Sequence, residues 1–126
     1  MSKEFVSYDI ALAMKELGFD KKCFKSYQIG KYGLGGQEYI QLMDVAYDDF
    51  IDLCHAPLYQ QAFRWFREKY SWNGWVDQGF TESFRYNICE SNGSIIGVEG
   101  FSTYEEAELA CLRKLIEIVN QNKDDG

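Results

Sequence analysis

Apolar residues in the middle of the chain recur at helical spacing. From Leu58 onward they follow the i, i+4, i+7, i+8 pattern of one helical face, and a second apolar stripe lies beside the first. Pro57 suits the first turn of such a helix, because the amide hydrogen that proline lacks would have no partner there. The pattern predicts a helix over residues 57–70. Its apolar arc is wider than one packing partner covers, which indicates a helix packed between a sheet and another layer.

Two further helices are predicted toward the ends of the chain. The first follows Ser7 and ends at Gly18, where a left-handed residue stops the helix. The second runs to about Asn120, with a frayed tail over 121–126. Its start carries two overlapping capping boxes, Thr103 with Glu106 and Ser102 with Glu105.

Shorter segments in the first half alternate between apolar and polar residues, as strands do. Alternation over 22–29 and again over 38–43 predicts a hairpin across the glycine-rich stretch 30–36. Residues 44–54 are harder to assign, because their apolar spacing favours a helix while their aspartates favour turns. We expect a short helix there.

The second half predicts three strands. Residues 71–75 resemble a turn that leads into a strand through Trp75 and Val76, and residues 83–89 alternate cleanly. Asn92-Gly93 is the strongest hairpin signal in the chain, and residues 94–99 form the partner strand. The second half therefore has the order α-β-β-β-α. The whole chain is predicted to be an α+β domain, an antiparallel sheet with helices packed on it.

Length, composition and charge narrow the class of protein. A chain of 126 residues fits one domain over 1–126, and its 17% aromatic content supplies a packed core, so no cofactor is needed to explain folding. The net charge is −7 with a pI near 4.7. This sign disfavours nucleic acid and anionic membranes as partners and fits a protein partner, or a surface that only keeps the chain soluble.

The chain also predicts a cytoplasmic protein. Its first residues lack a basic region followed by an apolar run, and no stretch approaches the roughly 20 apolar residues of a membrane span. The four cysteines are far apart and lie among apolar neighbours, which is typical of reduced, buried thiols. They are Cys23, Cys54, Cys89 and Cys111.

Aromatic residues near the central helix are the strongest candidates for a binding site. Trp72 and Trp75 flank Asn73-Gly74, which predicts an exposed loop, and Tyr59 and Tyr70 lie at the two ends of the helix. Together they could form a stacking platform. The alternative is core packing, which we expect for Trp65.

Groups that carry catalysis or bind metals are few. His55 is the only histidine, and next to Cys54 it could form a nucleophilic pair only if adjacent side chains met at one reaction centre. Zinc would require cysteines without any Cys-x-x-Cys pair to converge. The aspartates over 44–52 lack the spacing of a calcium loop, and the glycines over 30–36 lack a phosphate-loop ending. We therefore predict no catalytic residue, metal or cofactor.

The α-β-β-β-α order is also that of double-stranded-RNA-binding domains. Those domains place lysines at the start of the last helix, where they meet phosphates. This chain carries Glu105, Glu106 and Glu108 there, which would repel an RNA backbone. RNA binding remains an alternative that the charge opposes.

Two segments carry a resemblance to a known family. Residues 56–70 (APLYQQAFRWFREKY) and 103–112 (TYEEAELACL), with residues 10–20 (IALAMKELGFD), resemble short proteins of Bacteroides-type gut bacteria and their phages or prophages. The resemblance covers most of the chain and is weakest over 32–53. It implies a mobile-element context and no catalytic residue. We therefore expect a non-enzymatic accessory protein that binds a macromolecule, most plausibly a protein, with a small-molecule binder or an enzyme as alternatives.

Overall fold

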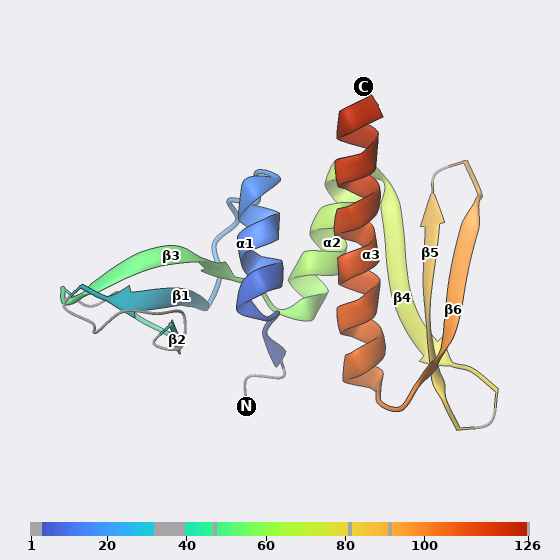
Figure 1. The fold of residues 1–126 in the computed structure, drawn as a ribbon, viewed down its shortest axis with the longest axis horizontal. Coiled ribbons are helices and arrows are strands. Elements are labelled where there is room, and N and C mark those ends of the chain that lie inside the picture. Colours follow the sequence, from blue (N-terminus) through green and yellow to red (C-terminus); the bar gives the residue numbers. More distant parts are fainter. Residues whose placement is uncertain (1–3, 32–39, 47, 81, 91, 126) are drawn as a thin grey trace. The chain divides into compact units, whose positions relative to one another are not determined.

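The computed structural model describes residues 4–31, 40–46, 48–80, 82–90 and 92–125. Figure 1 shows three helices and two three-stranded antiparallel sheets over these residues. The arrangement confirms the predicted α+β class. In chain order the elements are α1 (Tyr8–Glu16), β1 (Lys25–Gly30), β2 (Gln41–Met43), β3 (Phe50–Ala56), α2 (Tyr59–Tyr70), β4 (Trp72–Gln78), β5 (Phe84–Glu90), β6 (Ile95–Phe101) and α3 (Tyr104–Asp125).

The contacts divide the chain into two compact units, residues 1–58 and residues 59–126. In the first unit, β1 lies between β2 and β3 and α1 packs against β3. The Tyr27 hydroxyl donates a hydrogen bond of 2.6 Å to the Val6 carbonyl, and the Tyr8 ring packs edge-on against Tyr27. These contacts tie the sheet to the segment before α1.

The first helix ends as predicted. Gly18 has a φ of +102°, a left-handed value that costs glycine nothing, and the Phe19 N–H donates to the Met14 carbonyl at 2.9 Å. Ser7 occupies the N-cap position, but its side chain does not cap the helix and instead donates to Asp9. The backbone conformation thus sets the start of this helix without a side-chain cap.

The prediction of a short helix over 44–54 was wrong. Residues 50–56 form β3, which pairs antiparallel with β1 from Phe50 to Ala56. Pairing with β1 satisfies the backbone of this segment, and such a tertiary contact overrides weak helical spacing. Residues 32–39, which include most of the predicted glycine-rich connection and the start of the predicted strand over 38–43, lie outside the described residues.

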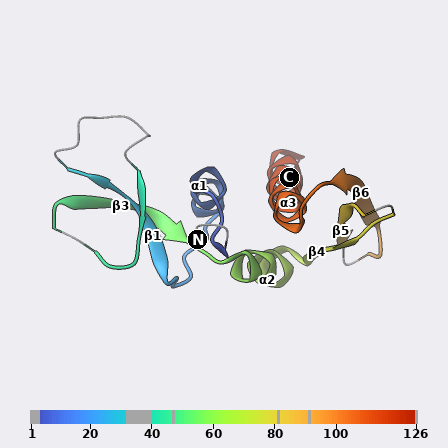
Figure 2. The ribbon, with the colours of Figure 1, turned by 90° about the horizontal axis from the view of Figure 1, so that it is seen from below.

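In the second unit, β5 lies between β4 and β6, α3 packs over β4 and β5, and α2 packs against β4 and α3 (Figure 2). The α-β-β-β-α order is confirmed. Gly74 marks the covered face, because a Cβ there would lie 3.0–3.3 Å from side-chain atoms of both helices. The fully buried members of this core include Phe66, Ile88, Cys111, Leu112 and Leu115.

Turn and capping residues in the sequence account for several ends of these elements, but the predicted turn over 71–75 and the predicted end of the last helix need correction. Gly93 has a φ of +93° in the turn between β5 and β6, as Asn92-Gly93 predicts. The Thr103 hydroxyl accepts a hydrogen bond of 3.1 Å from the Glu106 N–H, as in the predicted capping box, whereas the Glu106 carboxylate accepts one of 3.2 Å from the Ser102 N–H instead of the Thr103 N–H. The predicted turn over 71–75 was wrong beyond Ser71: Ser71, with a φ of +63°, separates α2 from β4, which begins at Trp72. The last helix extends to Asp125, because no breaker precedes Gly126.

Candidate functional site

The structure does not bring the four predicted aromatic residues together. Tyr59 and Tyr70 are the first and last residues of α2, about 16 Å apart at the rise of an α-helix. Trp72 and Trp75 are three positions apart in β4, so they point to opposite faces of the sheet. Tyr70 packs its ring 5.5 Å from the ring of Trp65, which is buried as predicted. Only Trp75, 38% exposed, lies on the uncovered face.

A polar cluster occupies that uncovered face. Arg85 of β5 donates two hydrogen bonds to Asp77 of β4, at 2.9 and 3.0 Å, and a third of 3.4 Å to Glu99 of β6. The three residues form one cross-strand row, because Arg85 pairs with both neighbours in the register. Arg85 thus links all three strands through hydrogen bonds, and its positive charge offsets part of the negative charge of Asp77 and Glu99.

Asn87 lies beside the row and is 7% exposed. Hydrogen bonding from Arg85 above all lowers the pKa of Asp77, with smaller contributions from Asn87 and Trp75. The Asn87 Nδ2 nevertheless has no partner of good hydrogen-bond geometry among the described residues. The neighbouring position on β6 is Gly97, which adds no side chain to this face. The hydrogen bonds of the polar cluster therefore run mainly between its own members.

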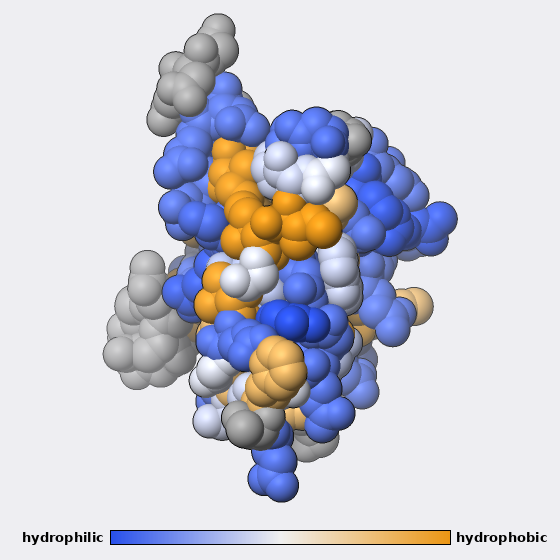
Figure 3. All heavy atoms as spheres, turned by 90° about the vertical axis from the view of Figure 1, so that its right-hand side faces the viewer, coloured by the Kyte–Doolittle hydropathy of each residue, from blue (hydrophilic) through white to orange (hydrophobic). Residues whose placement is uncertain are grey.

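The β6 edge presents a different surface. Figure 3 faces this side of the second unit and shows an apolar band on it. Ile95 is 65% exposed and Val98 is 37% exposed, while Ile96 between them is half-buried. By register, Ile96 lies opposite Ile88 and Val98 opposite Tyr86, both buried, so these two apolar residues continue the core outward. Val98 is exposed because α3 packs mainly over β4 and β5, whereas Ile95 points to the opposite, uncovered face of the sheet.

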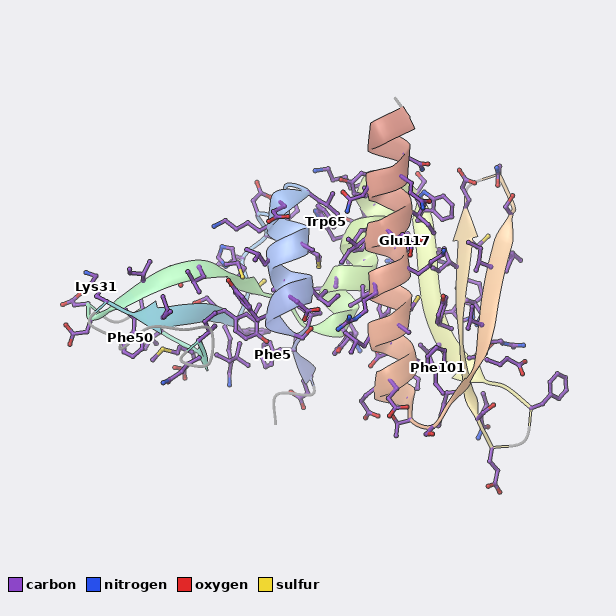
Figure 4. All side chains as sticks on the ribbon, in the orientation of Figure 1. Phe5, Lys31, Phe50, Trp65, Phe101 and Glu117 are labelled. Carbon is purple, nitrogen blue, oxygen red and sulfur yellow. The ribbon has the colours of Figure 1, made fainter. Side chains whose placement is uncertain are left out.

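The backbone of β6 is also available. β6 pairs with β5 on one side only, and within the described part of the chain no strand covers its other side. Five residues, 95–99, follow a regular register with β5. Gly100 is the extra residue of a bulge, with a φ of +104°, and Phe101 then packs its ring 5.8 Å from Tyr86 (Figure 4). The regular part of the edge is thus short and has Gly97 at its centre.

The other edge strands carry the features that discourage pairing. β4 exposes Asn73 and Gln78, and β3 carries Asp52, which accepts a hydrogen bond from Ser26. β2 is three residues long. Natural sheets protect their edges with polar side chains, bulges and short strands; β6 ends in the Gly100 bulge, but over 95–98 it carries no polar or charged side chain.

A cavity of about 390 Å³ lies in the second unit among α2, β4 and the start of α3. Arg64 and Arg67 line its α2 side, and Tyr104 and Glu108 line its α3 side. Arg64 is paired with Glu68 at 2.8 Å. Burial, and then the nearby Glu105, raise the pKa of Glu108 to about 7. The cavity therefore combines positive charge on one wall with a titrating carboxyl on the other.

A second cavity, of about 280 Å³, lies in the first unit and is lined in part by Lys15, Asp52, Cys54 and His55. Burial raises the pKa of Cys54 to about 11, so its thiol is protonated at neutral pH and a poor nucleophile. Cys54 is buried and His55 exposed, as neighbours in a strand are. The described residues contain no group of three or more side chains placed to hold a metal ion.

Comparison with known proteins identifies no relative: no family model, curated protein or solved structure matches the chain. None of the described helices has the length and apolar composition that a membrane span requires. The case for a site therefore rests on geometry.

Sequence reasoning missed the β6 edge as a surface. The strand itself was predicted, and its run Ile95-Ile96-Gly97-Val98 lacks the charges that protect an edge, which was a usable signal. The sequence does not specify which strand ends the sheet, so the exposure of Val98 could not be read from it.

Proposed function

We propose that this chain is a non-enzymatic, cytoplasmic accessory protein that binds another protein, and that the β6 edge is its contact surface. The single observation that supports this most is the exposed apolar edge strand. An unpaired edge offers backbone hydrogen bonds to a partner strand, and its alternate side chains offer apolar contact. The family resemblance adds phage or prophage biology as the proposed setting.

Charge favours protein over nucleic acid as the partner. The start of α3, which in an RNA-binding domain of this order would meet phosphates, carries three glutamates within four positions, at 105, 106 and 108. With a net charge of −7, the chain has no general attraction for RNA. The β6 edge needs no phosphate, because its chemistry is that of an apolar strand.

Affinity capture from a nuclease-treated lysate of a Bacteroides-type bacterium tests the proposal. The wild-type chain should retain a protein that the Val98→Lys variant loses, because lysine on an edge strand opposes pairing. Phe80→Ser is the matched control: Phe80 is 77% exposed in the loop between β4 and β5, so this variant also loses exposed apolar surface, away from β6. Equal capture by all three chains, or capture that nuclease abolishes, would overturn the proposal.

The cavity among α2, β4 and α3 supports a second candidate function, the binding of a small molecule. Arg67 lies on the wall formed by α2, and Glu108 lies on the wall formed by α3. A ligand with a carboxylate at one end and a hydrogen-bonding group at the other would fit these walls. Differential scanning fluorimetry with amino acids and dicarboxylates tests this candidate: a stabilisation that Arg67→Ala abolishes would favour it over the β6 edge.

A further inference from the structure

We infer that the partner of the β6 edge is a second copy of this chain, paired antiparallel through β6 so that two sheets join into one of six strands. The inference rests on the proposed function of this edge as a protein contact. A second copy fits this edge because β6 is self-complementary: in one antiparallel register its apolar residues pair with one another.

Only some registers keep the helices of both copies on the same face of the joined sheet. In an antiparallel pair, directly opposite residues point to the same face. The two-fold axis must therefore lie midway between the two copies of one β6 residue, so that this residue pairs with itself. If a residue paired instead with its neighbour in sequence, a helix-facing side chain would lie opposite an outward-facing one. The regular part of the edge is residues 95–99, and its central residue is Gly97. A two-fold axis at Gly97 uses the whole regular edge.

This register pairs apolar residues with one another on the helix-facing side. Ile96 lies opposite Val98 of the second copy, and symmetry repeats the pair. Both side chains extend a core that already contains Ile88 and Tyr86, so the apolar band of Figure 3 is covered from both copies. On the other face, Ile95 lies opposite Glu99 of the second copy. Gly97 meets its own counterpart with no side chain in the way.

Charge is compatible with this arrangement at close range. Glu99 is the one acidic residue of β6, and in this register it does not face Glu99 of the second copy. Within its own chain it accepts a hydrogen bond from Arg85, which offsets its charge. The net charge of −7 on each chain repels the copies at long range, so salt should strengthen the dimer by screening. An interface dominated by five residues a side is small, and the dimer should dissociate on dilution.

Sedimentation equilibrium of the full chain over a concentration series tests the inference. We expect a reversible monomer–dimer equilibrium that shifts toward dimer between low and high NaCl. Val98→Lys should weaken dimerisation at least tenfold, and Phe80→Ser should leave it unchanged. A dimer that Val98→Lys does not weaken would overturn the inference.

Cysteine cross-linking tests the register. Gly97→Cys should form a disulfide-linked dimer under mild oxidation, because residues at the two-fold axis bring their Cα atoms within disulfide range. A Cβ at position 97 has its nearest atom at 3.6 Å, so the variant is accommodated. The wild-type chain, with its four native cysteines, is the control. Ile95→Cys alone should not cross-link, whereas its mixture with Glu99→Cys should. Cross-linking of Ile95→Cys to itself would overturn the proposed register.

The two proposals fail in different ways. A chain that stays monomeric at every concentration, but captures another protein that Val98→Lys loses, overturns the second copy as occupant and leaves the β6 edge as a binding surface. A chain that neither dimerises nor captures a protein through β6 overturns both.

Discussion

Gly74 lies directly against Cys111: a Cβ atom at Gly74 would be 3.0 Å from the Cys111 Sγ and 3.2–3.3 Å from carbons of Leu115 and Phe63. The absence of a side chain at this position in β4 thus lets both helices pack close to the sheet. Gly74→Ala should overpack this contact and lower the free energy of unfolding by about 1–3 kcal/mol. Urea denaturation measures the loss.

Gly97→Ala is the matched control for that prediction. Gly97 also lies within a strand of the same sheet, but a Cβ there would be 3.6 Å from the nearest side-chain atom, an ordinary contact. Its stability, measured on dilute protein, should change by less than about 1 kcal/mol. Equal losses for the two variants would show that glycine in a strand, and not the approach of Cys111, sets the cost.

Glu108 should make stability depend on pH between about 4.5 and about 7. Burial raises its pKa in the folded protein to about 7 from the ordinary 4.5, so the folded state binds more protons than the unfolded state in this window. Stability therefore falls as pH rises through the window and stays lower above it. Glu108→Gln should be more stable than wild type at pH 8, by about 1 kcal/mol, since solvent screens this half-buried group. Chemical denaturation at pH 4 and pH 8 tests this.

A control separates this effect from a general loss of negative charge. Glu16→Gln removes an exposed carboxylate at the end of α1 and measures the effect of lost charge without burial. If Glu108→Gln gained no more stability than Glu16→Gln at pH 8, a strained ionised Glu108 would be ruled out.

The Arg85–Asp77 pair should stabilise the fold at neutral pH and not in acid. Hydrogen bonds from Arg85 hold the pKa of Asp77 below its ordinary value of 3.8, so the stabilisation is present above 3.8 and is lost as pH falls through the lowered pKa. Asp77→Asn should melt at a lower temperature than wild type at pH 7, and the two Tm values should converge as pH falls below 3.8 and the Asp77 carboxylate becomes protonated. A gap that persists unchanged in acid would mean that Asp77 acts through packing.

Trp65 and Trp75 should differ sharply in their contribution to stability. Trp65 is buried, contacts Phe66 and Tyr70, and has the Lys69 ammonium 5.1 Å from its ring centroid. Trp65→Ala should cost about 3–5 kcal/mol. Trp75→Ala, on the uncovered face of the sheet, should cost less than about 1.5 kcal/mol. Equilibrium denaturation of the two variants gives the comparison; similar losses would mean that Trp75 is a core residue.

The elements that the sequence predicted best are those with local signals. Asn92-Gly93 specifies its turn, Thr103 with Glu106 specifies the start of α3, and Gly18 specifies the end of α1, because each acts within a few residues of itself. β3 was missed since its stability comes from pairing with β1, twenty residues or more away along the chain.

The candidate site was harder to predict for the same reason. Trp72 and Trp75 were assigned to a loop because Asn73-Gly74 resembles a turn. In the fold, the lack of a side chain at Gly74 lets two helices pack close to β4. This requirement comes from tertiary packing, so the neighbouring sequence does not indicate it. Similarly, the alternation of Phe84, Tyr86 and Ile88 predicted the covered face of β5, but the position of β6 at the edge follows only from the assembled sheet.

The placement of α3 has a consequence for synthesis. Cys111, Leu112 and Leu115 complete the covered face of the second sheet, yet they are translated after all six strands. Until α3 leaves the ribosome, Ile88 and Tyr86 lack their cover, and the nascent sheet exposes apolar surface on one face while β6 leaves its edge open. The interval before Leu115 emerges from the ribosome and packs on the sheet is therefore when the second unit exposes most apolar surface, and exposed apolar surface with an open strand edge promotes aggregation.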